Sequence, residues 1–271
     1  MSTTSLRQFP TGQCAGKLQD TSKNTRSELR DSGYVSYPEG ILWRSKPDGG
    51  NKIQLSAPPL FAALPGWSPD GKQIVFYNYS VGKPGRLYLV SIDGGSPQQL
   101  LSQDADPKQD PDWSPDGDKI IFGSVPADNH SALRVLDLKN HQVSTVPGSR
   151  GLFSPRWSPD GRYIVAMPAD SLSLVLFDLQ TEKWSQLAKV RAEFPNWSRD
   201  GKYIYFLRWL DNPAVLRVRI TDPKMEQVSD LTNLPTTGNI GPWLGLDADD
   251  APLLLKDTGT QDIYAVGWEE P

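Results

Sequence analysis

Cysteine, histidine and long apolar runs are all scarce in this sequence. Its one cysteine, Cys14, can form neither an intramolecular disulfide nor a cysteine-based zinc site. The longest apolar runs, such as Leu174–Phe177, are far shorter than the roughly 20 residues that a membrane-spanning helix needs. The first thirty residues hold no continuous apolar stretch, so we expect no signal peptide and no membrane segment in this chain.

Excess positive charge is also missing. The 28 Lys and Arg are outnumbered by 32 Asp and Glu, which gives a net charge of −4. A nucleic-acid-binding face needs a basic stripe to neutralise phosphates, so we expect no nucleic-acid partner. The apolar fraction of 37%, with 10% aromatic residues, is enough to bury a core and argues against wholesale disorder.

What the sequence does contain is a repeated motif. Trp-Ser-Pro-Asp-Gly occurs at 67–71, 113–117 and 157–161, and at 197–201 it returns as Trp-Ser-Arg-Asp-Gly. A worn fifth copy lies at 242–247, where Leu244 takes the place of the tryptophan. A fixed motif at a spacing of about 40 to 47 residues indicates copies of one small supersecondary unit.

Each copy carries the same series of strand and turn signals. In the first copy the motif is followed by the apolar run Gln73–Tyr77, a loop, the run Leu87–Val90, the turn Asp93–Gly95 and a last short run at Gln98–Leu101. Runs of β-branched and aromatic residues between turn formers predict strands. Pro and Gly suit the motif to a tight hairpin turn, and the preceding Trp suits a wedge between neighbouring sheets.

Four short antiparallel strands in each copy are typical of a propeller blade. The predicted fold is therefore all-β: a β-propeller of four-stranded antiparallel blades, about six in number, with the first and last incomplete. We expect the four tryptophans of the motif to be mostly buried between blades; they are Trp67, Trp113, Trp157 and Trp197.

The two ends of the repeat series are less regular. Strands are predicted at Tyr34–Tyr37, Ile41–Arg44 and Lys52–Leu55, but the first strand of that blade, expected near residue 23, is not evident. The last copy has a predicted third strand at Ile263–Val266 and no fourth. We therefore expect a poorly ordered tail over residues 1–32 and a propeller over 33–271, in a chain that is either an imperfectly closed ring or part of a longer protein.

The repeated Pro-x-Trp-Ser-Pro-Asp-Gly-Lys/Arg, with Asp-Gly-Gly after a third strand, resembles the TolB-like, WD-like β-propeller repeats of bacteria. The resemblance covers roughly residues 33–271. It implies a propeller fold, and similar propellers often form the C-terminal regions of larger proteins, including winged-helix regulators and Ser/Thr kinases. The sequence contains no winged helix and no kinase glycine loop or catalytic loop.

The serine of the motif superficially resembles a hydrolase nucleophile. In Gly66–Gly71, however, two residues separate Ser68 from the second glycine, whereas the hydrolase elbow is Gly-x-Ser-x-Gly. The same serine recurs at positions 114, 158 and 198, and the two histidines, His130 and His141, lie in hairpin or loop positions. We therefore interpret it as a turn-capping hydroxyl and assign no catalytic residue.

An acidic loop at residues 104–112 is the best candidate for a metal site. Its carboxylates Asp104, Asp106 and Asp110 could converge on a hard cation such as calcium. The loop lacks the glycine and the terminal glutamate of an EF-hand, so a solvated acidic loop is the favoured alternative. We expect no metal and no cofactor.

The residue between the proline and the tryptophan differs from copy to copy. We expect these residues to lie at the start of the innermost strands and to ring the mouth of the central channel. They would form a polar pocket of Asp112, Arg156 and Asn196 with Trp243 as an apolar wall. The alternative is that Asp112 and Arg156, on adjacent blades, simply pair with each other.

The loops that join the second and third strands are expected on the same face as this mouth. They include residues 78–85 and 209–213, whose Tyr79 and Trp209 we expect to be exposed for a partner. The leading hypothesis is a non-catalytic propeller that binds a protein or peptide or senses a ligand. The alternatives are a propeller hydrolase or lyase that uses channel carboxylates, the non-catalytic propeller of a peptidase, and a truncated gene product without an independent role.

Overall fold

The computed structural model describes residues 13–15, 32–36, 39–46, 49–124, 131–234, 243–247 and 249–254. These residues form 22 strands and no helix, and so no helix among them could cross a membrane. The strands make five antiparallel sheets of four strands and one sheet of two.

We name the four-stranded sheets blades 1 to 5 in chain order. The bounds of the strands are as follows: blade 1, β1 Gln13–Ala15, β2 Ser32–Ser36, β3 Ile41–Ser45 and β4 Ile53–Gln54; blade 2, β5 Ala62–Trp67, β6 Gln73–Asn78, β7 Arg86–Ser91 and β8 Gln98–Gln99; blade 3, β9 Gln109–Trp113, β10 Lys119–Gly123, β11 Arg134–Asp137 and β12 Val143–Thr145; blade 4, β13 Leu152–Trp157, β14 Tyr163–Pro168, β15 Leu174–Asp178 and β16 Lys183–Ala188; blade 5, β17 Glu193–Trp197, β18 Tyr203–Arg208, β19 Ala214–Arg219 and β20 Met225–Asp230; the two-stranded sheet, β21 Leu244–Leu246 and β22 Pro252–Leu254.

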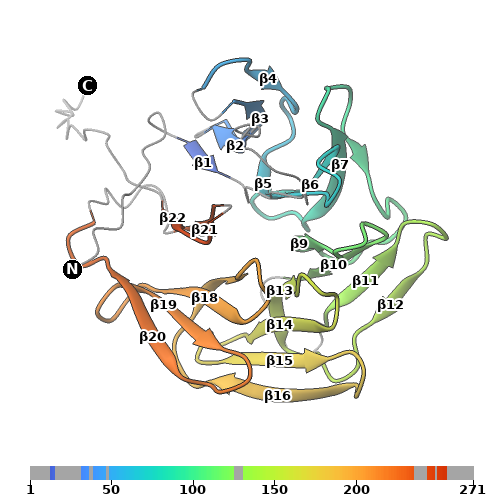
Figure 1. Ribbon diagram of the computed structural model, residues 1–271. Helices are drawn as coiled ribbons and strands as arrows, with labels where there is room; N and C mark the ends of the chain where they lie inside the picture. The colour runs from blue at the N-terminus through green and yellow to red at the C-terminus, as the bar shows by residue number, and fades with distance from the viewer. Residues whose placement is uncertain are drawn as a thin grey trace, which may run out of the picture.

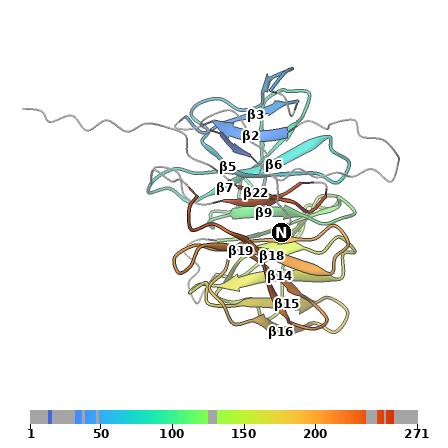
Figure 2. The ribbon, with the colours of Figure 1, turned by 60° about the vertical axis from the view of Figure 1, so that its left-hand side comes forward.

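The sheets follow one another around a ring in chain order (Figure 1). Within each blade the strands pair in sequence order, each antiparallel to the next. The first strands of successive blades lie next to one another around the centre, as β5, β9, β13, β17 and β21 do. Figure 2 shows the same sheets turned by 60°, with their strands running across the view. The fold is therefore the predicted all-β propeller of four-stranded antiparallel blades.

The predicted number of blades was wrong. The structure has five four-stranded blades instead of about six, and the first of them is complete because β1 pairs with β2, from Gln13 opposite Ser36 to Ala15 opposite Tyr34. β1 is three residues long and is separated from β2 by residues 16–31, so neither a hairpin turn nor the motif marks it in the sequence. The predicted tail, 1–32, and the predicted strand Ile263–Val266 lie mostly or wholly outside the described residues.

The repeated motif forms the hairpin turn between the first and second strands, and its serine holds that turn together. In blade 2 the Ser68 hydroxyl donates to Oδ1 of Asp70 at 2.7 Å and accepts the backbone N–H of Gln73 at 2.9 Å. The Asp70 carboxylate also accepts the N–H of Lys72 at 3.0 Å. The serines at 114, 158 and 198 make the same set of bonds and are almost fully buried. The predicted turn-capping role of the serine is thus confirmed.

The tryptophans of the motif are wedges between blades, as predicted. Their exposed fractions are 4 to 8%. Each one lies in a separate apolar cluster that joins its own blade to the preceding blade: Trp67 between blades 1 and 2, Trp113 between 2 and 3, Trp157 between 3 and 4, and Trp197 between 4 and 5. In the worn copy Leu244, 1% exposed, takes the same place between blade 5 and the two-stranded sheet. The core is therefore a series of inter-blade layers.

Candidate functional site

The innermost strands of blades 2 to 5 share a bulge at one position. Three residues before each tryptophan, and directly before a proline, the backbone takes a positive φ: 43° at Leu64, 51° at Asp110, 53° at Ser154 and 51° at Phe194. The pairing with the second strand shifts register at the same place in every case. A left-handed backbone is costly for side chains such as Leu and Phe, so a bulge kept in four blades is a built feature that re-aims the strand.

The residues expected at the channel mouth lie at the other end of their strands. Each motif tryptophan is the last residue of an innermost strand, as Trp113 is of β9. Asp112, Arg156 and Asn196 therefore stand beside the hairpin turns, one residue before the end of β9, β13 and β17. The loops between second and third strands lie at the opposite end of the blades, because successive strands are antiparallel. The prediction that both groups share one face was wrong.

Arg156 and two aspartates form a buried charge cluster between blades 3 and 4. Nη2 of Arg156 donates to Oδ1 of Asp110 at 2.7 Å, and Oδ2 of Asp112 accepts the backbone N–H of Trp157 at 2.7 Å. Asp110 and Asp112 are 7% and 5% exposed. Arg156 thus forms its ion pair with Asp110 instead of the predicted Asp112. All three residues join the two innermost strands.

The charges of this cluster decide the protonation of Arg156. Burial alone would lower the pKa of the guanidinium, because it penalises the charged form. The nearby carboxylates of Asp110 and Asp112, together with the hydrogen bond to Asp110, outweigh this penalty, so the pKa of Arg156 is raised. The arginine therefore stays charged and forms an ion pair with Asp110 inside the protein.

Asn196 and Trp243 lie at the junction of blade 5 with the two-stranded sheet. Nδ2 of Asn196 donates to the carbonyl oxygens of Phe194 at 2.8 Å and Leu244 at 3.0 Å. The half-buried Trp243 covers Gly245, where an added Cβ would lie 2.3 Å from the indole ring. The structure therefore brings Asp112 and Arg156 together but joins Asn196 to β21. Asp112, Arg156 and Asn196 thus make contacts between successive sheets, whereas Trp243 packs on its own sheet.

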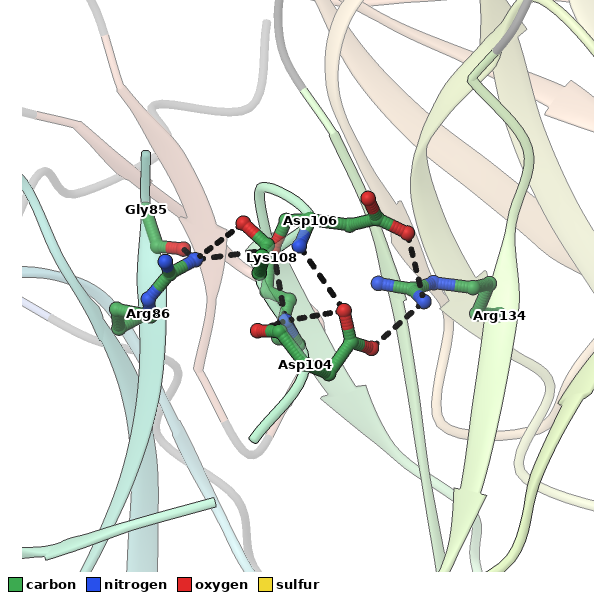
Figure 3. A network of polar contacts seen from close by, with 7 residues as sticks. Gly85, Arg86, Asp104, Asp106, Lys108 and Arg134 are labelled. Carbon is green, nitrogen blue, oxygen red and sulfur yellow. Dashed lines mark hydrogen bonds and ion pairs between the residues drawn. The ribbon is translucent and has the colours of Figure 1, made fainter. Parts of the chain in front are cut away.

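The acidic loop between β8 and β9 is filled by the chain's own cations (Figure 3). Lys108 is fully buried, and its Nζ donates to the carbonyl oxygens of Asp104 and Asp106, both at 2.7 Å, and lies 3.2 Å from Oδ1 of Asp104. Arg134 of blade 3 reaches Oδ2 of Asp104 at 2.8 Å and Oδ2 of Asp106 at 3.4 Å. From blade 2, Nη1 of Arg86 donates to the carbonyl oxygen of Asp106 at 3.0 Å.

This arrangement does not bring the predicted metal ligands together. Asp104 and Asp106 face Lys108 and Arg134, whereas Asp110 pairs with Arg156. Over the described part of the chain, no group of three or more His, Cys, Asp or Glu is placed to hold a metal ion. The ammonium of Lys108 occupies the oxygen-lined position that a cation would take.

The carboxylate of Asp104 is held in its charged form by this network. Burial would raise the pKa of Asp104, but the N–H of Asp106, the hydrogen bond from Lys108 and the charge of Arg134 together lower it. The pKa of Lys108 is lowered, chiefly because the ammonium is taken out of water. The loop therefore links blades 2 and 3, because Arg86 of blade 2 and Arg134 of blade 3 both bind it.

Among the described residues, most of the exposed large apolar side chains lie in the loops between second and third strands. Tyr79 and Val81 in blade 2 are 48% and 86% exposed, Leu172 in blade 4 is 45% exposed, and Leu210 in blade 5 is 65% exposed. The predicted exposure of Tyr79 is confirmed. Trp209 is half-buried against the cluster between blade 5 and the two-stranded sheet, so its predicted exposure was wrong. Residues 125–130, in the loop of blade 3, lie outside the described residues.

Three features were not found from the sequence. The bulge residues could have been found from the residue before each repeated proline, which stands three positions before the tryptophan. Lys108 could not, because an isolated lysine in a polar loop gives no sign that it will be buried. The exposure of Leu210 has no sequence signal, because the neighbouring Trp209 is the larger apolar residue of the same loop.

The ring of four-stranded blades with tryptophan wedges defines a β-propeller. The family model of the TolB beta propeller domain matches residues 41–233, and the chain belongs to this family. No curated protein matches the chain.

Solved structures share the fold at low sequence identity. The putative TolB of Agrobacterium tumefaciens is 17% identical, with a TM-score of 0.70 over 92% of this chain and 90% of that one. TolB from Acinetobacter baumannii is 19% identical, with a TM-score of 0.64 over 88% of this chain and 56% of that one, so this chain spans little more than half of its length. A chain of the nidogen/laminin complex is 12% identical, with a TM-score of 0.61 over 74% of this chain and 76% of that one.

Proposed function

We propose that this protein is a non-catalytic propeller that binds a protein partner through the loops between the second and third strands of its blades. We call the exposed Tyr79, Val81, Leu172 and Leu210 the loop-tip patch. The patch lies at the end of the blades away from the repeated hairpin turns.

One observation carries this proposal. Four of the seven large apolar side chains that are exposed in the described residues belong to three short loops at one end of the propeller. Of the other three, Val143 and Met225 lie on the outermost strands and Leu179 lies in a turn at the opposite end. Single exposed apolar residues are ordinary, but their gathering on one face is typical of a protein-binding surface.

The remaining candidate residues support a scaffold role. Asp112, Arg156 and Asn196 are used in contacts between blades, and the motif serines are used in their own turns. A nucleophile or general base must be free to reach a substrate, whereas these groups are bonded within the fold. We therefore assign function to the loop-tip patch.

Two triple variants test the proposal, and each adds three negative charges to the protein. Val81→Asp/Leu172→Asp/Leu210→Asp places three carboxylates in the loop-tip patch. Val143→Asp/Leu179→Asp/Met225→Asp places three on exposed apolar positions elsewhere. A partner captured from the source organism by the wild-type protein is purified, and its Kd is measured against all three proteins.

We expect the loop-tip variant to weaken binding at least 100-fold, because a buried interface tolerates unpaired charges poorly. The control variant should bind within about twofold of wild type, and all three should melt within a few degrees of one another. If both variants lose affinity equally, or if the loop-tip variant loses none, the partner does not bind the loop-tip patch. Turnover of an ester, peptide or glycoside that disappears in Asp112→Ala contradicts the non-catalytic assignment.

A further inference from the structure

The outer half of blade 5 presents a polar aromatic surface toward the two-stranded sheet. Along β18 and β19, Tyr203 lies opposite Arg219 and Tyr205 lies opposite Arg217, so all four side chains share one face. Tyr203 and Tyr205 belong to the apolar cluster that includes Leu244 of β21. This face therefore points to the side where the next sheet lies.

The side chains on this face are closely interlocked. Nε and Nη2 of Arg217 contact Oε2 of Glu226 at 2.9 and 2.8 Å, and its Nη1 donates to the Tyr205 hydroxyl at 3.0 Å. The guanidinium lies 4.4 Å from the ring centre of Tyr203. The exposed Arg219 donates to the Tyr203 hydroxyl at 2.5 Å and lies 5.1 Å from the same ring. We call these five residues the tyrosine–arginine surface.

The tyrosine–arginine surface is complementary in charge to an acidic strand. Two guanidinium groups stand against the single carboxylate of Glu226, so the cluster has a net positive charge. In blades 4 and 5 the third strands pack against each other in one apolar cluster, which contains Leu176 of β15 and Leu216 of β19. A third strand of the last sheet would by the same stacking lie against β19, which carries both arginines.

The C-terminal segment of this chain has the acidic composition that would suit this surface. Residues 256–271 begin two positions after the end of β22, the second strand of the last sheet. They contain four acidic residues and one basic residue, together with the apolar run Ile263–Val266 that the sequence predicts as a strand. We propose that residues 256–271 dock on the tyrosine–arginine surface, with an acidic side chain paired to Arg219. This inference is independent of the proposed partner binding.

Hydrogen exchange of the full-length protein, followed by mass spectrometry, tests the docking. We expect the amides of residues 262–268 to exchange at least tenfold more slowly than an unstructured peptide in the wild type, because docking protects them. Arg219→Gln should speed their exchange by up to about fivefold, the effect of one exposed ion pair. Asp262→Asn/Glu269→Gln/Glu270→Gln and 1 M salt should do the same, since both weaken the charge attraction.

Arg162→Gln is the matched control. Arg162 is an exposed arginine on blade 4 whose partner, Asp178, lies on the same blade, so its loss should leave residues 262–268 unchanged. Peptides that cover β18 and β19 should keep their protection in all variants, which shows that blade 5 stays folded. Exchange of residues 262–268 at the unstructured rate in the wild type overturns the proposal. So does protection that neither Arg219→Gln, the acidic-residue variant nor salt reduces.

Discussion

The backbone N–H of Arg199 donates a hydrogen bond to Oδ1 of Asp250 at 2.8 Å. The copies at 67–71, 113–117 and 157–161 have proline at this position, and proline has no N–H to donate. There the proline packs instead on the glycine of the next turn, as Pro115 does on Gly161, where an added Cβ would lie 3.3 Å away. The worn fifth copy has alanine at 248 where the motif has this glycine, and at this junction the hydrogen bond of Arg199 takes the place of the proline contact.

Arg199→Pro should therefore loosen the two-stranded sheet without unfolding the blades. The loss of the N–H removes a bond of about 1 kcal/mol, so amides of residues 244–254 should exchange several-fold faster. A proline that fits the turn also stiffens the unfolded chain by about 0.4–1 kcal/mol, so the global free energy of unfolding should change little. Arg199→Ala keeps the N–H and is the control. Equal exchange in the Pro and Ala variants would show that the bond is not what holds this sheet.

The oxygen-lined loop around Lys108 should depend on its ammonium. Lys108→Met leaves the carboxylate and the carbonyl oxygen of Asp104 without this donor, whereas the carbonyl oxygen of Asp106 keeps its bond from Arg86, so the change should destabilise the protein by about 3–5 kcal/mol. Lys83→Met, at an exposed lysine, should change stability by less than about 0.5 kcal/mol. Urea denaturation of the three proteins measures both effects. A loss below 1 kcal/mol for Lys108→Met would mean that water replaces the ammonium.

Much of the fold was predictable because the motif fixes its own register. Trp67 and its equivalents mark the end of each innermost strand, and the strands after each turn follow from β-branched and aromatic runs such as Ile74–Tyr77. β1 was not predictable, since three residues pair with β2 across a long connection that leaves no local signal. The sequence thus reveals strands that hairpin turns join but not those that distant pairing creates.

The site was predicted less well, because a repeat shows which positions are equivalent but not which way they face. Asp112, Arg156 and Asn196 were correctly grouped as equivalent, yet the bulge beside them and the contacts with the next blade arise from packing between copies. The burial of Lys108 likewise depends on Arg134, which lies on another blade. Contacts of this kind are set by the ring and not by any one repeat.

The stability of the hairpin turns should fall in acid. The Ser114 hydroxyl, and next to it the N–H of Asp118, lower the pKa of Asp116 against the opposing effect of burial. A pKa lowered in the folded state stabilises the protein above the ordinary value of 3.8, and this contribution is lost as the pH falls through the folded value. Ser114→Ala should therefore cost about 1–2 kcal/mol at pH 7 and less at pH 2.

Urea denaturation at the two pH values measures this difference. Ser185→Ala is the control, because Ser185 is exposed and makes only a long contact of 3.4 Å to the Leu176 carbonyl oxygen. Its small effect should be the same at both pH values. A cost for Ser114→Ala that does not change with pH would mean that the Asp116 carboxylate contributes nothing to the turn.

Variants of the Arg156–Asp110 pair test whether Arg156 stabilises the fold or binds a partner. Arg156→Met leaves Asp110, 7% exposed, as a buried charge without this partner, and should cost about 3–5 kcal/mol. Adding Asp110→Asn removes the stranded charge and should recover at least half of that loss, since asparagine tolerates the positive φ at this position. Arg162→Met, which removes an exposed pair, should lower the stability far less than Arg156→Met does.

The same variants also decide where the partner binds. If Arg156 only joins blades 3 and 4, the Arg156→Met/Asp110→Asn protein should bind the captured partner with unchanged Kd once it is folded, while Leu210→Asp weakens binding at full stability. Circular dichroism at the assay temperature confirms the folded fraction. If Arg156→Met/Asp110→Asn abolishes binding of the partner and Leu210→Asp does not, the binding site lies at the central strands. The partner would then recognise the charge of Arg156 and not the apolar side chains of the loops.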